Sequence, residues 1–411
     1  MSPVLLVGIT VFTGFVGGEL ARRVGLPKVT GYILAGVLLN PTLTGFVPED
    51  FTRHTDLVTN IALCFITFSV GGTLLWKRIK EQGKDIVYIT LGEGEFAFLV
   101  TFVGILLLAP LLMSGEGASW TTTFLPVALL MGCLAGPTDP SATLAVVHQY
   151  KSEGIVTSTV LGVAAFDDVL GIINYSLAIA LAEILLADRG FSLAAFVGDP
   201  IWAIGGAVGL GVLAGGAFNL LLRLIGRETE GVLIVVVLAM LSLCFGVATV
   251  IGVDELLATM TMGAMTVNFS ARQEKVFKVL GRYTEELIFV LFFTLSGMHL
   301  DFSVLAQHVL LVACFVVLRS LGKGLGTAAG AALARAPGKV RKYVAGGLIP
   351  QGGIVIGLAL LMKQNEAFEG IADVVISVII GATVIHELLG PVLSKAAISA
   401  AGEISDDHGA S

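Results

Sequence analysis

Long apolar stretches, separated by short charged or Gly/Pro-rich breaks, cover the chain as far as about residue 396. A hydrocarbon core about 30 Å thick needs about 20 helical residues, and fewer where a segment crosses only partly. The pattern therefore predicts thirteen membrane segments, at 3–21, 27–40, 55–76, 85–113, 121–148, 155–186, 196–225, 230–250, 254–268, 284–298, 302–334, 340–363 and 370–396. No stretch is left for a soluble domain, and we expect residues 397–411 to form a short, acidic, disordered cytoplasmic tail.

Positive charge is distributed very unevenly between the loops. When alternate loops are assigned to alternate sides, nineteen of the 24 lysines and arginines fall on one side and three on the other. The remaining two, Arg319 and Lys323, lie inside the eleventh segment. Because cytoplasmic loops are enriched in Lys and Arg, we predict an N-terminus outside, a C-terminus in the cytoplasm, and a place in the cell (inner) membrane.

Composition excludes several other classes of protein. Only 13% of residues are charged and 55% are hydrophobic, with a mean hydropathy of +0.93, whereas soluble domains average about 25% charged residues. The net charge of −7 and the lack of an arginine–aromatic patch argue against a nucleic-acid partner. The four cysteines stand singly in apolar runs, as small apolar side chains do. We expect an all-α polytopic membrane protein with no cofactor.

Two adjacent acidic residues lie at membrane depth. Such groups cost at least about 2 kcal/mol each and are therefore candidates for function. Asp167 and Asp168 lie about twelve residues into the sixth segment, which is about 18–20 Å from its cytoplasmic end at 1.5 Å per residue. Adjacent helix positions differ by about 100°, so both can serve one site only where the helix borders a cavity. The alternative is that the pair merely solvates a water-filled vestibule.

Two segments carry interruptions that a regular helix does not tolerate. In the fifth segment, Pro137 and Pro140 flank Thr138 and Asp139, and each proline removes an N–H and crowds a carbonyl one turn back. A broken helix frees carbonyls and half-helix ends that can meet an ion. Asp139 can face a cation or simply cap the new helix start.

The twelfth segment is interrupted in the same way, at the stretch Pro350-Gln351-Gly352-Gly353. Two such breaks in corresponding halves indicate a transporter built on inverted repeats, here segments four to six and eleven to thirteen. The acidic pair follows the first break by about 30 residues, and His386-Glu387 follow the second by about 36. We therefore expect Gln351 and Glu387 near the site.

The eleventh segment supplies the only deep cations of the thirteen. Arg319 and Lys323 are four residues apart and share one helix face. Arginine stays charged and needs a buried anion; repeat geometry favours Asp167 as its partner, with Asp139 and Glu387 as alternatives. Lys323 either joins the site or extends toward the cytoplasmic edge.

Three further polar residues lie near the ends of predicted segments. Glu93 and Glu95 lie two apart near the start of the fourth segment, so at most one reaches a central site, and we favour interfacial or intersubunit roles for them. His148 ends the fifth segment, where it is either a pH sensor or, as we favour, an ordinary surface group.

These motifs, in this order, resemble those of the monovalent cation:proton antiporters. The stretch 25–41 (GLPKVTGYILAGVLLNP) is similar to the opening signature of that superfamily, and the two breaks, the Asp-Asp pair and the Arg319–Lys323 stretch follow. The resemblance covers residues 3–396 and is closest to bacterial-type Na+/H+ antiporters with an Asp-Asp motif. It implies a fold with two crossed, broken helices.

The resemblance also implies a function and an assembly. A homodimer would exchange Na+, Li+ or K+ for protons by an elevator-type movement, with net charge transfer as in Asp-Asp members. The core or transport domain would lie mainly in 85–186 and 302–396, and the dimerisation or scaffold part mainly in 1–76 and 196–298. Asp168 would bind the ion, with Asp167 beside it salt-bridged to the basic residue of the eleventh segment.

The residue types around Asp168 also suggest which oxygen atoms bind the cation. Hard cations prefer oxygen ligands, so we expect Asp168, Asp139 and Thr138 to hold Na+, and Asp167 to belong to the same cation- and proton-binding group. The alternative function is an ion-coupled transporter of an anionic solute on the same fold, and a non-transporting sensor is a third.

Overall fold

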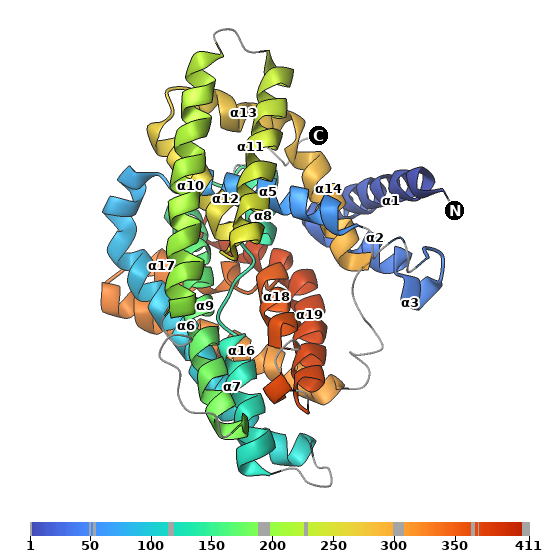
Figure 1. The fold of residues 1–411 in the computed structure, drawn as a ribbon, viewed down its shortest axis with the longest axis vertical. Helices are drawn as coiled ribbons and strands as arrows, with labels where there is room; N and C mark the ends of the chain where they lie inside the picture. The colour runs from blue at the N-terminus through green and yellow to red at the C-terminus, as the bar shows by residue number, and fades with distance from the viewer. Residues whose placement is uncertain are drawn as a thin grey trace. The chain divides into compact units, whose positions relative to one another are not determined.

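The computed structural model describes residues 2–48, 51, 55–113, 119–187, 198–225, 229–298, 308–362, 366–368 and 370–404. Over these residues the chain is helical and contains no strand (Figure 1). The helices are α1 (Pro3–Arg23), α2 (Lys28–Leu39), α3 (Pro41–Thr44), α5 (Asp56–Thr73), α6 (Trp76–Leu112), η1 (Trp120–Phe124), α7 (Leu125–Cys133), α8 (Pro140–Gln149), α9 (Ile155–Ala187), α10 (Asp199–Leu224), α11 (Glu230–Ile251), α12 (Glu255–Phe269), α13 (Gln273–Tyr283), α14 (Glu285–Met298), α16 (Val309–Ala334), α17 (Gly338–Gly347), α18 (Gly353–Met362), η3 (Glu366–Phe368) and α19 (Ala372–Ala400).

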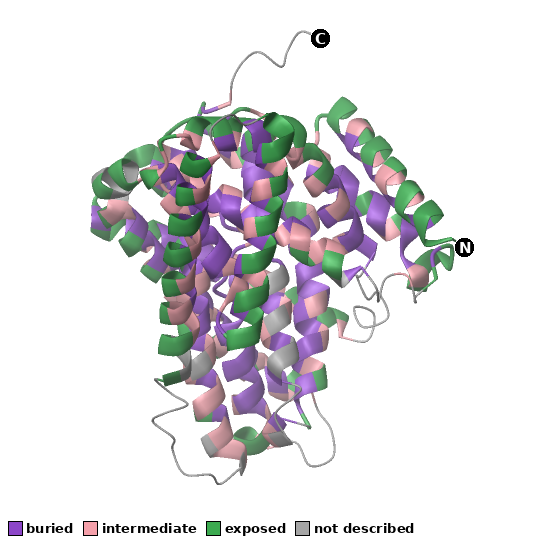
Figure 2. Cartoon of the chain, turned by 45° about the horizontal axis from the view of Figure 1, so that its top comes forward, coloured by how far each residue is buried: buried purple, intermediate pink, exposed green. Residues whose placement is uncertain are grey.

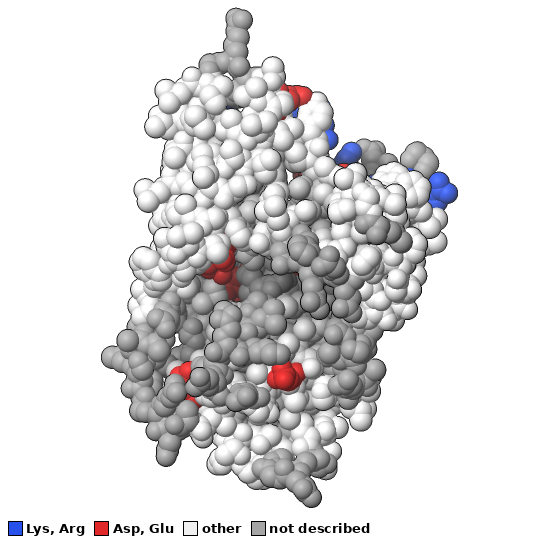
Figure 3. Space-filling model, turned by 45° about the vertical axis from the view of Figure 1, so that its right-hand side comes forward, with Lys and Arg blue, Asp and Glu red and all other residues white. Residues whose placement is uncertain are grey.

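The apolar pattern predicted these helices because lipid leaves a spanning segment no other way to satisfy its backbone. Over the described residues, each of the thirteen predicted segments coincides with a helix or with consecutive shorter helices; residues 196–197, 302–307 and 363 of these segments lie outside the described residues. Among the described residues, seven helices are long and apolar enough to cross a membrane: α1, α6, α9, α10, α11, α16 and α19. Exposed residues follow the outward sides of the long helices (Figure 2), and the described part of the face drawn in Figure 3 is mostly uncharged.

Helix boundaries differ from the prediction where charged residues continue a helix. The helix α6 begins at Trp76 rather than at residue 85, because the Lys, Arg, Glu and Gln of this stretch are good helix formers. The amphipathic helix α13 was not predicted; Val276, Val279 and Leu280 form its buried side. The helix α19 continues to Ala400 and the described residues to 404, so the expectation of a disordered tail over 397–411 is wrong for residues 397–400, and residues 405–411 lie outside the described residues.

The chain divides into two compact units, each made of two stretches of sequence. Unit 1 comprises Met1–Glu81 and Pro200–His299, and unit 2 comprises Gln82–Asp199 and Leu300–Ser411. Within unit 1, α2 packs against α1 and α14, and α5 packs against α12. Within unit 2, α19 packs against α8, α16, α17 and α18. Both broken segments and the Asp167–Asp168 pair therefore lie in unit 2.

Glycines bring α6 and α16 of unit 2 into backbone contact. A Cβ atom on Gly326 would lie 2.1 Å from the carbonyl oxygen of Gly92, and one on Gly330 would lie 2.2 Å from that of Tyr88. Small residues at four-residue spacing permit such close approach of membrane helices. The contact fixes the register of the two helices and places Glu93 of α6 opposite Lys323 of α16.

Candidate functional site: two helix breaks and a buried charge cluster

Both predicted interruptions are present, and they meet each other. The backbone leaves the helix between α7, which ends at Cys133, and α8, which begins at Pro140. It leaves it again between α17 and α18, over residues 348–352. The backbone N–H of Asp139 donates to the carbonyl oxygen of Pro350 over 3.0 Å. The two breaks thus form one structural centre in unit 2.

Asp139 caps the N-terminus of α8, the helix that follows the first break. Its Oδ1 accepts a hydrogen bond from the backbone N–H of Ser141 over 2.8 Å, and the Ser141 hydroxyl contacts the same oxygen. Its buried Oδ2 has no hydrogen-bond donor among the described residues. A Cβ atom on Gly352 would lie 2.7 Å from this Oδ2. One carboxylate oxygen therefore serves the helix, and the other faces the second break.

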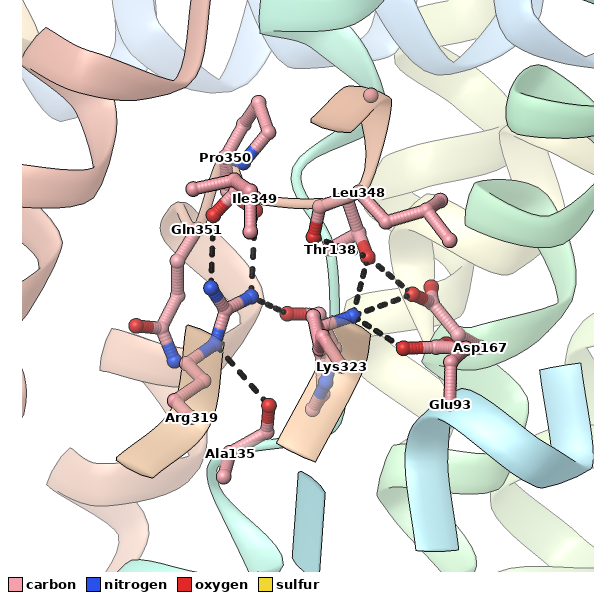
Figure 4. Close-up of polar contacts among 12 residues, drawn as sticks. Glu93, Ala135, Thr138, Asp167, Arg319, Lys323, Leu348, Ile349, Pro350 and Gln351 are labelled. Atoms are coloured by element: carbon pink, nitrogen blue, oxygen red, sulfur yellow. Dashed lines mark hydrogen bonds and ion pairs between the residues drawn. The ribbon is translucent and has the colours of Figure 1, made fainter. Parts of the chain in front are cut away.

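Arg319 of α16 ties the two breaks together through their carbonyls (Figure 4). Its side chain is fully buried. The Nε donates to Ala135 O over 3.0 Å and Nη1 to Ile349 O over 2.7 Å. The Nη2 donates to Pro137 O over 2.9 Å and, less closely, to Pro350 O over 3.3 Å. A planar guanidinium has five donors in a fixed fork, which suits four carbonyls freed by two chain breaks.

The expected partner of Arg319 was Asp167, and the structure corrects this assignment. The four hydrogen bonds of Arg319 that reach the breaks all end on backbone carbonyls. Repeat geometry suggested an anion because an arginine in a membrane needs charge compensation. The carbonyls at the two breaks, which carry partial negative charge, are its hydrogen-bond acceptors instead.

Lys323, one helical turn farther along α16, is the cation that contacts the acidic residues (Figure 4). Its Nζ lies 2.6 Å from Glu93 Oε2 and 3.4 Å from Asp167 Oδ2. It also donates to the Thr138 hydroxyl over 2.7 Å, and that hydroxyl in turn donates to Asp167 Oδ2. All four side chains are buried. Lys323 therefore belongs to the site and does not extend toward the cytoplasmic edge.

The two adjacent aspartates of α9 have different surroundings. Asp167 is 1% exposed and belongs to the Lys323 cluster. Asp168, about 100° around the helix, is only half-buried. The pair thus consists of one buried carboxylate, whose Oδ2 contacts Lys323 and Thr138, and one that is more accessible.

Gln351 and His386 form a second polar layer behind the breaks. The Gln351 side chain donates from Nε2 to Leu134 O over 2.9 Å, so it links the second break to the first. Its Oε1 lies 2.9 Å from Nδ1 of His386, a residue of α19 that is 1% exposed. Glu387, the next residue, is also buried, at 2% exposure. Gln351 therefore connects the backbone of the first break to His386 of α19.

Glu93 is the site residue that the sequence reasoning placed wrongly. It was expected at an interface, but it is fully buried in unit 2 against Lys323. The glycines of α16 at four-residue spacing, with Gly92 in α6, were the available signal. Glu95 is half-buried and accepts from Asn174 of α9 over 3.3 Å. His148 is exposed at the end of α8, which fits a surface group.

Among the described residues, no three His, Cys, Asp or Glu side chains converge as a transition-metal site would require. The oxygen atoms near the breaks come from carboxylates, a hydroxyl and backbone carbonyls, which is the ligand chemistry of hard cations.

Comparison with known proteins agrees with this geometry. Residues 8–395 match the family described as sodium/hydrogen exchanger, transmembrane. The chain is 21% identical over 379 residues to the Na+/H+-K+ antiporter GerN of Bacillus cereus, with 90% of this chain and 92% of that protein covered. It is 22% identical over 214 residues to Na+/H+ antiporter 1 of Methanocaldococcus jannaschii, covering 52% and 46% respectively.

The fold is also that of a solved antiporter. The structure of the sodium proton antiporter MjNhaP1 from Methanocaldococcus jannaschii at pH 8 superposes with a TM-score of 0.69 and 19% sequence identity, covering 97% of this chain and 98% of that chain. The family match extends over nearly the whole chain and includes both breaks and the acidic pair. This multi-pass membrane protein therefore belongs to the sodium/hydrogen exchanger family of cation/proton antiporters.

Proposed function

We propose that this protein exchanges Na+, Li+ or K+ for protons, and that Asp168 is the carboxylate at which the two compete. The observation that carries the proposal is the place of the Asp167–Asp168 pair, whose first member touches Thr138 of the helix break. Asp167 is buried and contacts Lys323 and Thr138, whereas Asp168 is half-buried and so more accessible. The relative GerN is a Na+/H+-K+ antiporter, so K+ is included among the cations to be tested.

Competition for one carboxylate is sufficient for exchange. In this proposal Asp168, the free oxygen of Asp139 and the Thr138 hydroxyl hold the cation through oxygen atoms. A bound cation disfavours protonation of the same carboxylate, because a neighbouring positive charge favours its ionised form. An unloaded charge is costly to carry through the hydrocarbon core. Only the cation-bound and the protonated forms then reorient, and each crossing exchanges one for the other.

We assign the movement to an elevator mechanism with unit 2 as the transport domain. Both breaks, the acidic pair and the two buried cations lie within this one compact unit, which supports movement as a rigid body. Unit 1, which includes the predicted scaffold range 1–76 and residues 200–298 of the range 196–298, is assigned to the scaffold and the homodimer contact. The membrane orientation is the one given by positive charge, with the N-terminus outside and the C-terminus in the cytoplasm.

We further propose that transport is electrogenic. The cluster holds Glu93 and Asp167 against the single cation Lys323, so it contains more than one group that can exchange protons as a cation enters. Transport of an anionic solute is disfavoured, because Arg319 and Lys323 are already bonded to carbonyls, carboxylates and a hydroxyl.

The decisive measurement is proton movement in proteoliposomes that contain a pH dye. Na+, Li+ or K+ is added outside, with the membrane potential either clamped or free, and wild type is compared with Asp168→Asn. We expect cation-evoked proton efflux in wild type, a rate that depends on voltage, and no efflux in the variant. Glu230→Gln, which changes an exposed carboxylate in the first turn of α11, is the matched control and should exchange normally.

Each alternative has its own outcome. Normal exchange by Asp168→Asn would remove Asp168 from the mechanism. Exchange that ignores the membrane potential would contradict electrogenic transport but leave the antiport intact. If folded wild-type protein moves no protons with any of the three cations, the proposed substrate is wrong.

A further inference from the structure

The helix that carries the acidic pair has no cap of its own. α9 begins at Ile155, and the residue before it, Gly154, has no side chain. The first N–H groups of a helix have no partner within the helix, and Ser, Thr, Asp or Asn at the preceding position usually accepts from them. The nearby Ser152 hydroxyl lies 2.7 Å from the Thr157 hydroxyl, so it bonds to a side chain of the first turn.

A carboxylate from almost 250 residues later takes the place of that cap. Glu403 Oε1 accepts from the backbone N–H of Val156 over 2.8 Å, and Oε2 accepts from the backbone N–H of Thr157 over 2.7 Å. Oε2 also accepts from the Thr157 hydroxyl over 2.8 Å. Glu403 is only 8% exposed. Negative charge at a helix N-terminus is further favoured by the helix dipole.

The chain around Glu403 is built to hold it there. After α19 ends at Ala400, the backbone turns through Gly402, whose φ is +72°. Lys339, in the first turn of α17, donates to the carbonyl oxygen of Ala401 over 2.8 Å. The backbone N–H of Glu153 donates to the carbonyl oxygen of Glu403 over 3.1 Å. The start of α9, the start of α17 and the end of α19 are therefore joined at one point within unit 2.

Gly154 leaves the space that this carboxylate occupies. A Cβ atom on Gly154 would lie 2.1 Å from Cδ and 2.4 Å from Oε1 of Glu403. Any side chain at residue 154 would therefore displace Glu403. The N-terminus of α9 can therefore be capped by a side chain at residue 154 or by Glu403, but not by both.

We propose that Glu403 is a positioning residue that holds the first turn of α9 and, through this continuous helix, the Asp167–Asp168 pair about three turns farther along. Its transport consequence rests on the exchange proposed above. Loss of Glu403 then loosens the start of α9 and shifts Asp168 relative to the helix breaks. The apparent affinity for the cation falls, while the maximal rate is retained.

The first test compares Glu403→Ala with wild type by amide hydrogen exchange and by transport. Loss of an N-cap corresponds to a roughly 2- to 30-fold change in local opening, so exchange should accelerate by that factor at residues 155–158 and more weakly as far as Asp168. The KM for the cation should rise several-fold at an unchanged maximal rate. Poor folding alone would lower the maximal rate and leave KM as it is. A chain that ends at Ile404 retains Glu403 and is the control.

The second test moves the cap to its usual place. Gly154→Asp alone should perturb α9, because its side chain collides with Glu403. Combined with Glu403→Ala, the same aspartate has the open space and caps α9 locally, so exchange protection and KM should return toward wild type. Glu403→Gln, which retains one carbonyl acceptor, should lie between Glu403→Ala and wild type, and it serves if the alanine variant folds poorly.

Several results would overturn the proposal. Unchanged amide exchange at residues 155–158 in Glu403→Ala would exclude capping. Faster exchange in the first turn with an unchanged KM, or no rescue by Gly154→Asp, would exclude positioning of the site. If wild type moves no cation at all, the proposed function fails. Amide hydrogen exchange then still tests whether Glu403 positions the Asp167–Asp168 pair. In that case faster exchange that reaches Asp168 supports positioning, and exchange confined to the first turn refutes it.

Discussion

Replacing Arg319 by lysine keeps a positive charge in α16 but removes the planar fork that binds the two helix breaks. Arg319 donates to four backbone carbonyls, two from each break, over 2.7–3.3 Å. A lysine has one nitrogen at the end of a flexible stem. That nitrogen carries three N–H donors, so it cannot bond all four carbonyls.

The cost follows from the acceptors left behind. A buried acceptor without a partner destabilises the fold by about 1–3 kcal/mol, and at least one of the four carbonyls loses its donor. In a domain of roughly 150–250 residues, each kcal/mol lowers the unfolding midpoint by roughly 2–4 °C. Even the lower limit of about 1 kcal/mol therefore predicts a decrease of roughly 2–4 °C.

The assay is thermal unfolding of Arg319→Lys in detergent, together with cation-dependent proton flux in proteoliposomes. The control is Arg282→Lys, an equally conservative change at an exposed position of α13, where surface substitutions stay within about 0.5 kcal/mol. We expect Arg319→Lys to unfold several degrees lower and to exchange more slowly.

Equal unfolding midpoints for the two lysine variants would refute the reasoning. They would mean that Arg319 contributes its charge alone and that its geometry is unimportant. Such a result would restore the simpler view of Arg319 as a counter-ion for a carboxylate.

Two further predictions concern the contact between α6 and α16. Lys323→Met leaves Glu93 buried without the cation that it touches at 2.6 Å. This should lower the free energy of unfolding by about 3–5 kcal/mol. Adding Glu93→Gln should recover part of this loss in a thermal unfolding experiment. Gly326→Ala places a Cβ atom 2.1 Å from the carbonyl oxygen of Gly92, so the helices must separate, at about 1–3 kcal/mol. The same change at Gly324, where a Cβ atom would meet nothing within 4 Å, should be harmless.

Each of these two predictions has an outcome that would contradict it. A double variant no more stable than Lys323→Met would show that Glu93 does not depend on the lysine. Equal unfolding temperatures for the two glycine variants would show that α6 and α16 tolerate separation.

The membrane helices were predictable because lipid permits few alternatives. An apolar run of sufficient length must be helical, and two prolines around Thr138 and Asp139 must interrupt it. The breaks in 134–139 and 348–352 therefore appeared where expected. The start of α6 at Trp76 was missed, because charged residues mark the edge of the membrane without ending a helix.

The partners within the site were less predictable, since side-chain spacing gives only a shared face. Arg319 and Lys323 do share a face, but the acceptors of Arg319 are backbone carbonyls, which have no signature in the sequence. The glycine spacing of α16 could have indicated that Glu93 is buried. It does so only when α6 is known to pack against α16. Glu403 had none, because it caps a helix that begins almost 250 residues earlier.

The four hydrogen bonds of Arg319 also impose an order on biosynthesis. The carbonyls of Ala135 and Pro137 emerge from the ribosome more than 180 residues before the arginine that binds them. Until α16 has entered the bilayer, these carbonyls lack that donor, and an unsatisfied backbone group in hydrocarbon costs several kcal/mol. The N-terminal break therefore cannot reach its final form until α16 has been made and inserted. Assembly of this site waits for the second half of the chain, although the residues of the first break are inserted earlier.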